Sequence, residues 1–344
     1  MDKTKINELR GLACLLVLAF HAIGSEPSLR ADVFGYFADS LQFVRMPIFI
    51  AITGVLYGMS RGSQPLTWAG WRKRMKRLLP AYLSVTLVIC TFNVLQGGPS
   101  LILFALVYGA WHLWYVLALG VILAAVVVIE ATVQLTSDKL WLAAALAASA
   151  AALGILGDVQ TFAISRAVAL LPFFLAGAAI GSAPKQQVAS PLATLIYAAG
   201  FTALILHQLS LHGIGAHWER GSIVASSLGM AGFLLVGVLC PRSRRLRQIG
   251  VHSFPIFLWH LPIFALASGL VLHHLRPEPH LAVIIRIALG VIVSICFAQL
   301  VELYVPNLAI WVGARSEKRR LIDSRREVGE GRLALNSESA RDPA

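Results

Sequence analysis

Long apolar runs, each close to 20 residues, recur along most of this chain and restrict what it can fold into. The hydrocarbon core of a bilayer is about 30 Å thick, so a helix crosses it with roughly 20 apolar residues. The composition agrees, because 57% of the 344 residues are hydrophobic, 13% are charged and the mean hydropathy is +0.73. Soluble domains carry about 25% charged residues. We therefore expect an all-α protein, a polytopic bundle of transmembrane helices.

About ten membrane spans are expected from these runs. A further run, "LILFALVYG" at 101–109, is too short to cross a bilayer and is expected to form a re-entrant or interfacial piece. The predicted spans are 8–24, 41–58, 79–96, 111–130, 140–157, 166–183, 191–211, 222–240, 253–273 and 281–304.

The basic residues indicate how the bundle is oriented. They gather in two short loops, 72–77 and 242–247, which alternate spans place on the same side as both chain ends. Cytoplasmic loops carry such an excess of Lys and Arg. The pattern predicts a multi-pass protein of the inner (plasma) membrane with both termini cytoplasmic. The net charge of +12 does not indicate nucleic-acid binding, because no aromatic residues interleave with the basic ones.

The last part of the chain differs in composition from the rest. Residues 314–344 mix charges of both signs with Ser, Gly and Pro. Such a segment has too few apolar residues to build a core. We expect one membrane domain over 1–313, followed by a disordered cytoplasmic tail over 314–344.

The first span carries an arginine at one end and a histidine deep inside. Arg10 and His21 are eleven positions apart, so they project from one helical face about 16 Å apart along the axis. Ionisable residues within a membrane are costly, and each is a functional candidate. This arrangement suits a ligand that enters from the cytoplasm and reacts within the membrane. The alternative is that Arg10 anchors the topology and His21 forms an interhelical hydrogen bond.

A second group of polar residues lies toward the C-terminal end. Ser253 and His260 are seven apart and share a helical face, and Pro255 and Pro262 free backbone carbonyls that can line a cavity. Glu302 lies inside the last span, where an unpaired carboxylate is costly, so a basic partner or a proton is implied.

Three more residues are candidates at the outer membrane edge. His112 and Trp114 belong to the stretch "HLWY", for which an aromatic belt is the simpler explanation. Arg45 precedes "MPIFIAITG" and has a simpler explanation as well, a side chain that reaches up to the interface.

The basic loop after the second span has two explanations of similar weight. It sets topology, or its guanidinium groups bind the phosphates of a nucleotide-like donor. Its arginines are Arg72, Arg74 and Arg77. No P-loop, zinc-protease or hydrolase motif is present, and the four cysteines have no metal or redox spacing, so no metal site is expected.

Taken together, these residues resemble the acyltransferase family 3 of integral-membrane O-acyltransferases, which modify surface polysaccharides, O-antigens and Nod factors. The opening "LRGLACLLVLAFH" is similar to the family's arginine, ten residues, histidine signature. Two positions depart from the pattern, since Thr53 stands where serine is usual and Phe257 where tyrosine is usual. The other similar stretches are "MPIFIAITGVLYG", "RKRMKRLLPAY", "WHLWYV", "LLPFFLAGAAIG", "SFPIFLWH" and "VELYVP".

The resemblance implies an acyl-CoA donor, most simply acetyl-CoA, as co-substrate and a carbohydrate hydroxyl, on a polysaccharide or lipid-linked oligosaccharide, as acceptor. Arg10 and the arginines of the basic loop are then expected to bind the CoA phosphates, and His21 to act as general base. Glu302 and His260 are expected to orient His21 or hold the acceptor. A covalent acyl-histidine relay is a lesser alternative. The competing class is a transporter or flippase of a lipid-linked sugar that uses the buried His and Glu residues as proton relays.

Overall fold

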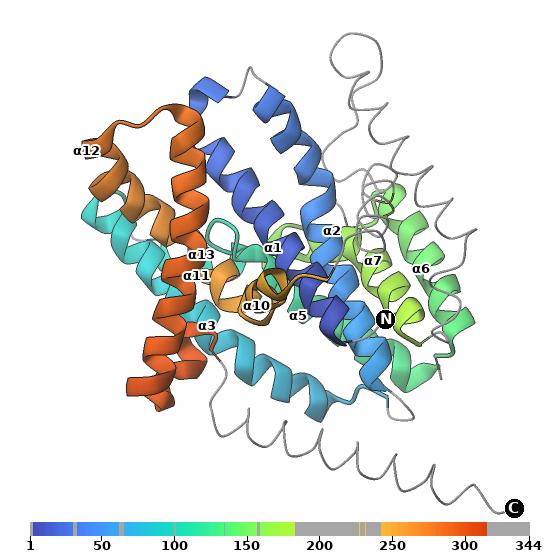
Figure 1. Cartoon of the computed structure of the whole chain (residues 1–344). Helices are drawn as coiled ribbons and strands as arrows, with labels where there is room; N and C mark the ends of the chain where they lie inside the picture. Colours follow the sequence, from blue (N-terminus) through green and yellow to red (C-terminus); the bar gives the residue numbers. More distant parts are fainter. Residues whose placement is uncertain are drawn as a thin grey trace, which may run out of the picture.

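The protein is a bundle of helices packed around a common core (Figure 1). Its structure, a computed structural model, describes residues 3–29, 33–61, 65–99, 101–133, 135–156, 159–182, 227, 231 and 242–314. Within these ranges every regular element is helical and there is no strand, as the sequence predicts. The long helices are α1 (Lys3–Gly24), α2 (Val33–Arg61), α3 (Trp68–Leu95), α5 (Trp114–Thr132), α6 (Ser137–Ala152), α7 (Ile164–Ser182), α11 (Ser253–Ala267) and α13 (Pro279–Tyr304).

Shorter elements join the long helices. The short α-helices are α4 (Ile102–Tyr108), α10 (Arg244–Val251) and α12 (His273–Leu275). The 3₁₀ segments are η1 (Pro27–Leu29), η2 (Thr161–Ala163) and η4 (Pro306–Val312), and η3 (Ser268–Leu272) is a π-helix that continues α11.

Seven helical segments of the described residues are long and apolar enough to cross a membrane. They correspond to predicted spans one to four, six, nine and ten. The predicted span 140–157 coincides largely with α6, which has 16 residues and is shorter than this criterion requires. The predicted spans 191–211 and 222–240 lie outside the described residues apart from positions 227 and 231, as does nearly all of the predicted tail. The protein is thus a multi-pass membrane protein, and the total of ten spans stays a prediction.

The run at 101–109 forms α4, a helix of seven residues that is too short to span a bilayer. It packs on α3 through Tyr82, whose hydroxyl donates to the carbonyl oxygens of Ala105 at 2.8 Å and Leu106 at 3.0 Å. Both carbonyls therefore have a hydrogen-bond partner within the bundle.

Glycines allow α2 and α7 to pack with their backbones in contact. A Cβ on Gly54 would overlap the carbonyl group of Phe174, and one on Gly177 would overlap that of Ala51. Small residues four positions apart create such contacts between membrane helices, where van der Waals packing replaces the hydrophobic effect. The four glycines are Gly54, Gly58, Gly177 and Gly181.

A similar contact joins α10 to α1. A Cβ on Gly11 would overlap the carbonyl of Leu246, and one on Gly250 would overlap that of Asn7. The carboxylate of Glu8 also accepts from the backbone N–H of Ser243 at 3.1 Å. This packing fixes the start of α11, which follows α10 directly, beside the arginine end of α1.

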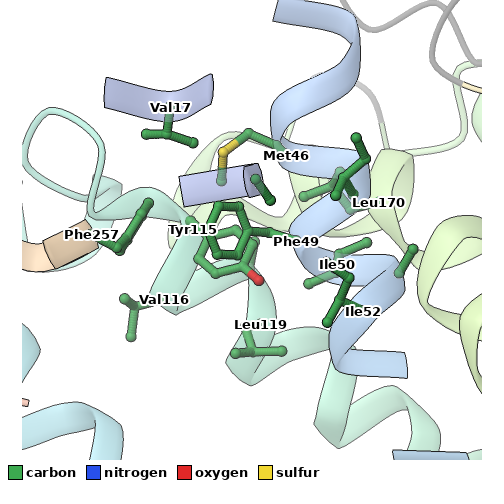
Figure 2. Packing of buried hydrophobic residues seen from close by; sticks show 14 of the residues in the cluster. Val17, Met46, Phe49, Ile50, Ile52, Tyr115, Val116, Leu119, Leu170 and Phe257 are labelled. Atoms are coloured by element: carbon green, nitrogen blue, oxygen red, sulfur yellow. The ribbon is translucent and has the colours of Figure 1, made fainter. Parts of the chain in front are cut away.

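The apolar core lies where α1, α2, α5, α7 and α11 meet (Figure 2). Its most deeply buried side chains come from all five helices and are at most 1% exposed. They include Val17, Leu18, Ile50, Ile122, Phe174 and Ile256.

Candidate active site

A cavity of about 530 Å³ opens near the end of the bundle that carries the chain's N-terminus. Its walls come from α1, α2, α3, α5, α10, α11, α13 and η4, so it collects residues from both ends of the chain. The lining is largely apolar with a limited number of polar groups, as ligand pockets usually are. The polar or ionisable side chains are Arg10, Thr53, Arg74, Arg77, Tyr115, His252, Ser253, Glu302 and Asn307.

Arg10 and Ser253 meet at the wall of this cavity. Nη2 of Arg10 donates to Oγ of Ser253 at 2.8 Å, across 243 positions of sequence. The docking of α10 on α1 brings the two residues together, because Ser253 is the first residue of α11. The bond holds the guanidinium, a group that suits the binding of an anion, at the wall of the cavity.

Arg74 reaches the cavity from α3 and lies near a buried carboxylate. Its Cζ lies 5.6 Å from the centre of the Tyr57 ring, and the hydroxyl of Tyr57 donates to Oε2 of Glu130. The backbone N–H of Leu66 donates to the same oxygen. Glu130 is not among the residues expected from the sequence, although a lone glutamate near the end of the apolar run "VILAAVVVIEATV" is itself a signal.

Three imidazole rings form a cluster deeper in the bundle. The ring centres of His21 and His260 are 5.2 Å apart, those of His112 and His260 4.7 Å, and those of His21 and His112 6.3 Å. His260 is 0% and His112 5% exposed, whereas His21 is only partly buried. His21 therefore lies at the accessible side of the cluster.

The hydrogen bonds at the cluster define which ring nitrogen accepts a hydrogen bond in His21 and in His260. Arg45 Nη1 lies 3.2 Å from Nε2 of His21, and since a guanidinium only donates, this Nε2 must be the accepting nitrogen. Nδ1 of His260 donates to the carbonyl of Phe257 at 2.8 Å. Its Nε2 is then an acceptor, and it has no hydrogen-bond partner in the described part of the chain.

Arg45 is held over the ring of Phe20. Its Cζ lies 3.3 Å from the ring centre, a close cation–π contact. The guanidinium therefore lies between the ring of Phe20 and His21.

The predicted residues thus fall into two groups. The cavity is lined by Arg10, Arg74, Arg77, Ser253 and Glu302. The imidazole cluster consists of His21, His112 and His260, and Arg45 lies beside His21. Glu302, predicted to orient His21 or hold the acceptor, lies on the cavity wall with Arg10.

Two predicted residues belong to neither group. Arg72 is exposed and does not line the cavity. Trp114 packs its ring against Arg166, whose Cζ lies 4.4 Å from the ring centre. Within the described ranges, no group of three or more His, Cys, Asp or Glu side chains is arranged to hold a metal ion.

A further buried charge was missed by the sequence-based analysis. Arg286 lies inside α13, is 6% exposed, and pairs with the carboxylate of Glu26. Its Nε and Nη2 both donate to Oγ of Ser268 at 3.2 Å. An arginine in the run "AVIIRIALG" is a clear signal, and its partners fix the exit of α1 to α13.

Comparison with known proteins identifies the family of this chain. A family model described as an acyltransferase domain, that of acyltransferase family 3, matches residues 4–302. The match includes the cavity residues up to Glu302 and all members of the imidazole cluster. No curated protein and no solved structure matches the chain. The protein is a membrane acyltransferase, and the chain belongs to acyltransferase family 3, as its motifs predict.

Proposed function

We propose that the protein transfers an acyl group, most simply acetyl, from acyl-CoA to a hydroxyl of a cell-surface or lipid-linked carbohydrate. One observation carries this proposal. A cavity with three arginines lies at one end of the bundle, and a cluster of imidazoles lies farther along the same helices. The cavity suits a polyphosphorylated donor, and the imidazole cluster suits proton transfer. The carbohydrate acceptor and the inner membrane as location rest on the family resemblance and on the charge pattern of the loops.

The donor binds at the cavity through its phosphates. Arg10, Arg74 and Arg77 supply planar guanidinium groups, which bind phosphate oxygens in pairs. The volume of about 530 Å³ is in the range of ordinary ligand pockets. CoA is larger than such ligands, so part of it extends from the cavity mouth toward the exposed basic residues of α3 and α10.

His21 is the general base of the reaction. Its Nε2 accepts a hydrogen bond, so it holds the lone pair that removes a proton from the acceptor hydroxyl. The hydroxyl oxygen then bonds to the thioester carbonyl carbon, and the carbon–sulfur bond breaks as the tetrahedral intermediate collapses. The imidazolium returns the proton to the departing thiolate. The products are a carbohydrate ester and free CoA thiol.

Arg45 stabilises the oxyanion in this mechanism. Its Nη1 occupies the lone pair of His21 Nε2 before substrates arrive, and the acceptor hydroxyl takes that place. The freed N–H group then lies within reach of a carbonyl oxygen bound next to His21. Donors that point to the developing charge, fixed here by the ring of Phe20, are a large source of rate enhancement.

Purified protein with radiolabelled acetyl-CoA and crude lipid-linked glycan tests the proposal. Wild-type protein should transfer label to the glycan fraction, and the Phe173→Leu variant, altered in a buried residue away from both groups, serves as a matched control. The absence of label transfer from acetyl-, propionyl- and succinyl-CoA by correctly folded wild type would contradict the donor assignment.

A further inference from the structure

Three aromatic side chains lie between the cavity and the imidazole cluster. Phe49, Tyr115 and Phe257, here called the aromatic partition, all line the cavity. In Figure 2 the rings of Phe49 and Tyr115 overlap near the centre with Phe257 beside them, between Val17 of α1 and the cavity residue Val116. The Phe257 ring centre is 5.3 Å from that of Tyr115 and 6.2 Å from that of Phe49, so the three rings are in contact.

Phe257 is the member that touches both sites. It contributes to the cavity wall, and its ring centre is 5.0 Å from that of His112 and 6.2 Å from that of His260. Its carbonyl accepts from Nδ1 of His260. The residue is 3% exposed, so its ring fills the space between the two groups.

The face of α1 between the two groups is covered by neighbouring helices. Between Arg10 and His21 it carries Cys14, Val17 and Leu18, which are each at most 1% exposed. An acyl group that passes from the cavity to His21 along this face of α1 therefore meets the aromatic partition.

We propose that Phe257 is a specificity-determining residue that limits the size of the acyl group delivered to the imidazole cluster. This inference rests on the proposed function, because it assumes that an acyl-CoA bound in the cavity reacts at His21. The chemistry of the transfer is unchanged. A Phe257 ring that turns aside leaves beside the imidazole rings only the volume that it vacates, which holds an acetyl group but not a long acyl chain. A smaller residue at this position leaves that space open permanently.

The test compares donors of different length on the same variants. Wild type, Phe257→Ala and Phe257→Leu are assayed with acetyl-, butyryl- and octanoyl-CoA, and the ratio of kcat/KM for octanoyl to acetyl is measured for each. Pockets discriminate by about 10–200-fold per methylene, so we expect this ratio to rise at least 10-fold in Phe257→Ala and less in Phe257→Leu. Phe257→Trp should change preference in the opposite sense, lowering butyryl relative to acetyl transfer. Phe173→Leu, a buried phenylalanine of α7 outside the partition, should leave both ratios unchanged.

The outcomes separate this inference from the proposed function. If the variants transfer acetyl groups with wild-type ratios for longer donors, Phe257 does not set acyl size, and the proposed function stands. If wild type transfers no acyl group at all, the proposed function fails and the inference fails with it. Should Phe257→Ala not fold, Phe257→Leu and Phe257→Trp still decide, since unchanged ratios in both would overturn the inference.

Discussion

At the scale of single residues, the site separates binding of the donor from proton transfer. Arg10 and His21 share a face of α1, yet their partners differ. Arg10 bonds to Ser253 at the cavity, and His21 accepts from Arg45 beside two further imidazoles. Substitutions of Arg10 and His21 are therefore expected to impair different steps, donor binding and acyl transfer respectively.

His21→Ala should bind acyl-CoA like wild type and transfer almost nothing. Loss of a general base costs about 10²–10⁴-fold in rate, while the cavity residues that hold the phosphates are untouched. The measurements are acyl-CoA binding by calorimetry and label transfer, both made on the same preparation. Transfer at the wild-type rate would mean that His21 only packs.

Arg10→Ala should weaken donor binding, because a phosphate loses a charge-assisted hydrogen bond. Arg10→Lys should restore binding only in part, since an ammonium group lacks the planar fork that also reaches Ser253. The KM for acetyl-CoA and its dependence on salt are the measurements. If the KM for acetyl-CoA is unchanged in both variants, the CoA phosphates do not bind at Arg10.

Arg45→Gln should reduce kcat by about 10²–10³-fold with little change in donor KM, as expected for loss of an oxyanion donor. Arg45→Lys keeps the charge but loses the fork and should recover a fraction of the rate. Steady-state kinetics with acetyl-CoA distinguishes stabilisation of the oxyanion by Arg45 from a purely structural role. A raised donor KM with unchanged kcat would contradict it.

At the scale of helices, backbone contacts position these residues. The glycines of α2 and α7 join the helix that carries Arg45 to its neighbour, and Gly11 and Gly250 bring Ser253 to Arg10. Because carbonyl groups fill the places where a Cβ would be, even the smallest side chain must push the helices apart.

Gly177→Ala should lower the thermal stability of the detergent-solubilised protein, although alanine is the better helix former. Forcing an extra methyl group into a packed contact costs about 1–3 kcal/mol, which exceeds the propensity gain of about 1 kcal/mol. Gly24→Ala is the matched control, since a Cβ there meets nothing within 4 Å. Equal melting temperatures for the two variants would argue against a tight α2–α7 contact.

At the scale of the whole molecule, the sequence predicted the class of fold and the face of α1 well. Apolar length and a helical period are local properties, so they can be seen in one segment. His260 was expected to orient His21 or to hold the acceptor, but the meeting of His112 with both rings was not predicted, because it depends on how separate helices pack. Glu302 was expected to orient His21 or to hold the acceptor, and it lies on the cavity wall. Glu130 and Arg286 were visible as charges in apolar runs, but their partners were not.

The topology prediction is ten spans with both ends cytoplasmic. Reporter fusions at positions 65, 187 and 246 should read cytoplasmic, because each lies in or next to a loop on the basic side, and a fusion at 215 should not. An extracytoplasmic reading at 246 would rule out this topology.

Truncation before Glu317 should leave acyl transfer largely intact. The composition of the remaining tail does not support a packed core, and the family match ends at residue 302. Label transfer by correctly inserted truncated protein is the measurement, with the full chain as control. Loss of transfer would assign the tail a role in the reaction.

The hydrogen bond between Arg10 and Ser253 has a consequence for biogenesis. Its two ends are 243 positions apart, and ribosomes add about 5–20 residues per second, so α1 is made roughly 12–50 s before its partner. During that interval the guanidinium and the imidazole of α1 are in the growing chain without Ser253 or His260. The nascent N-terminal helix must therefore be sheltered, by lipid headgroups or by the insertion machinery, until the last helices arrive.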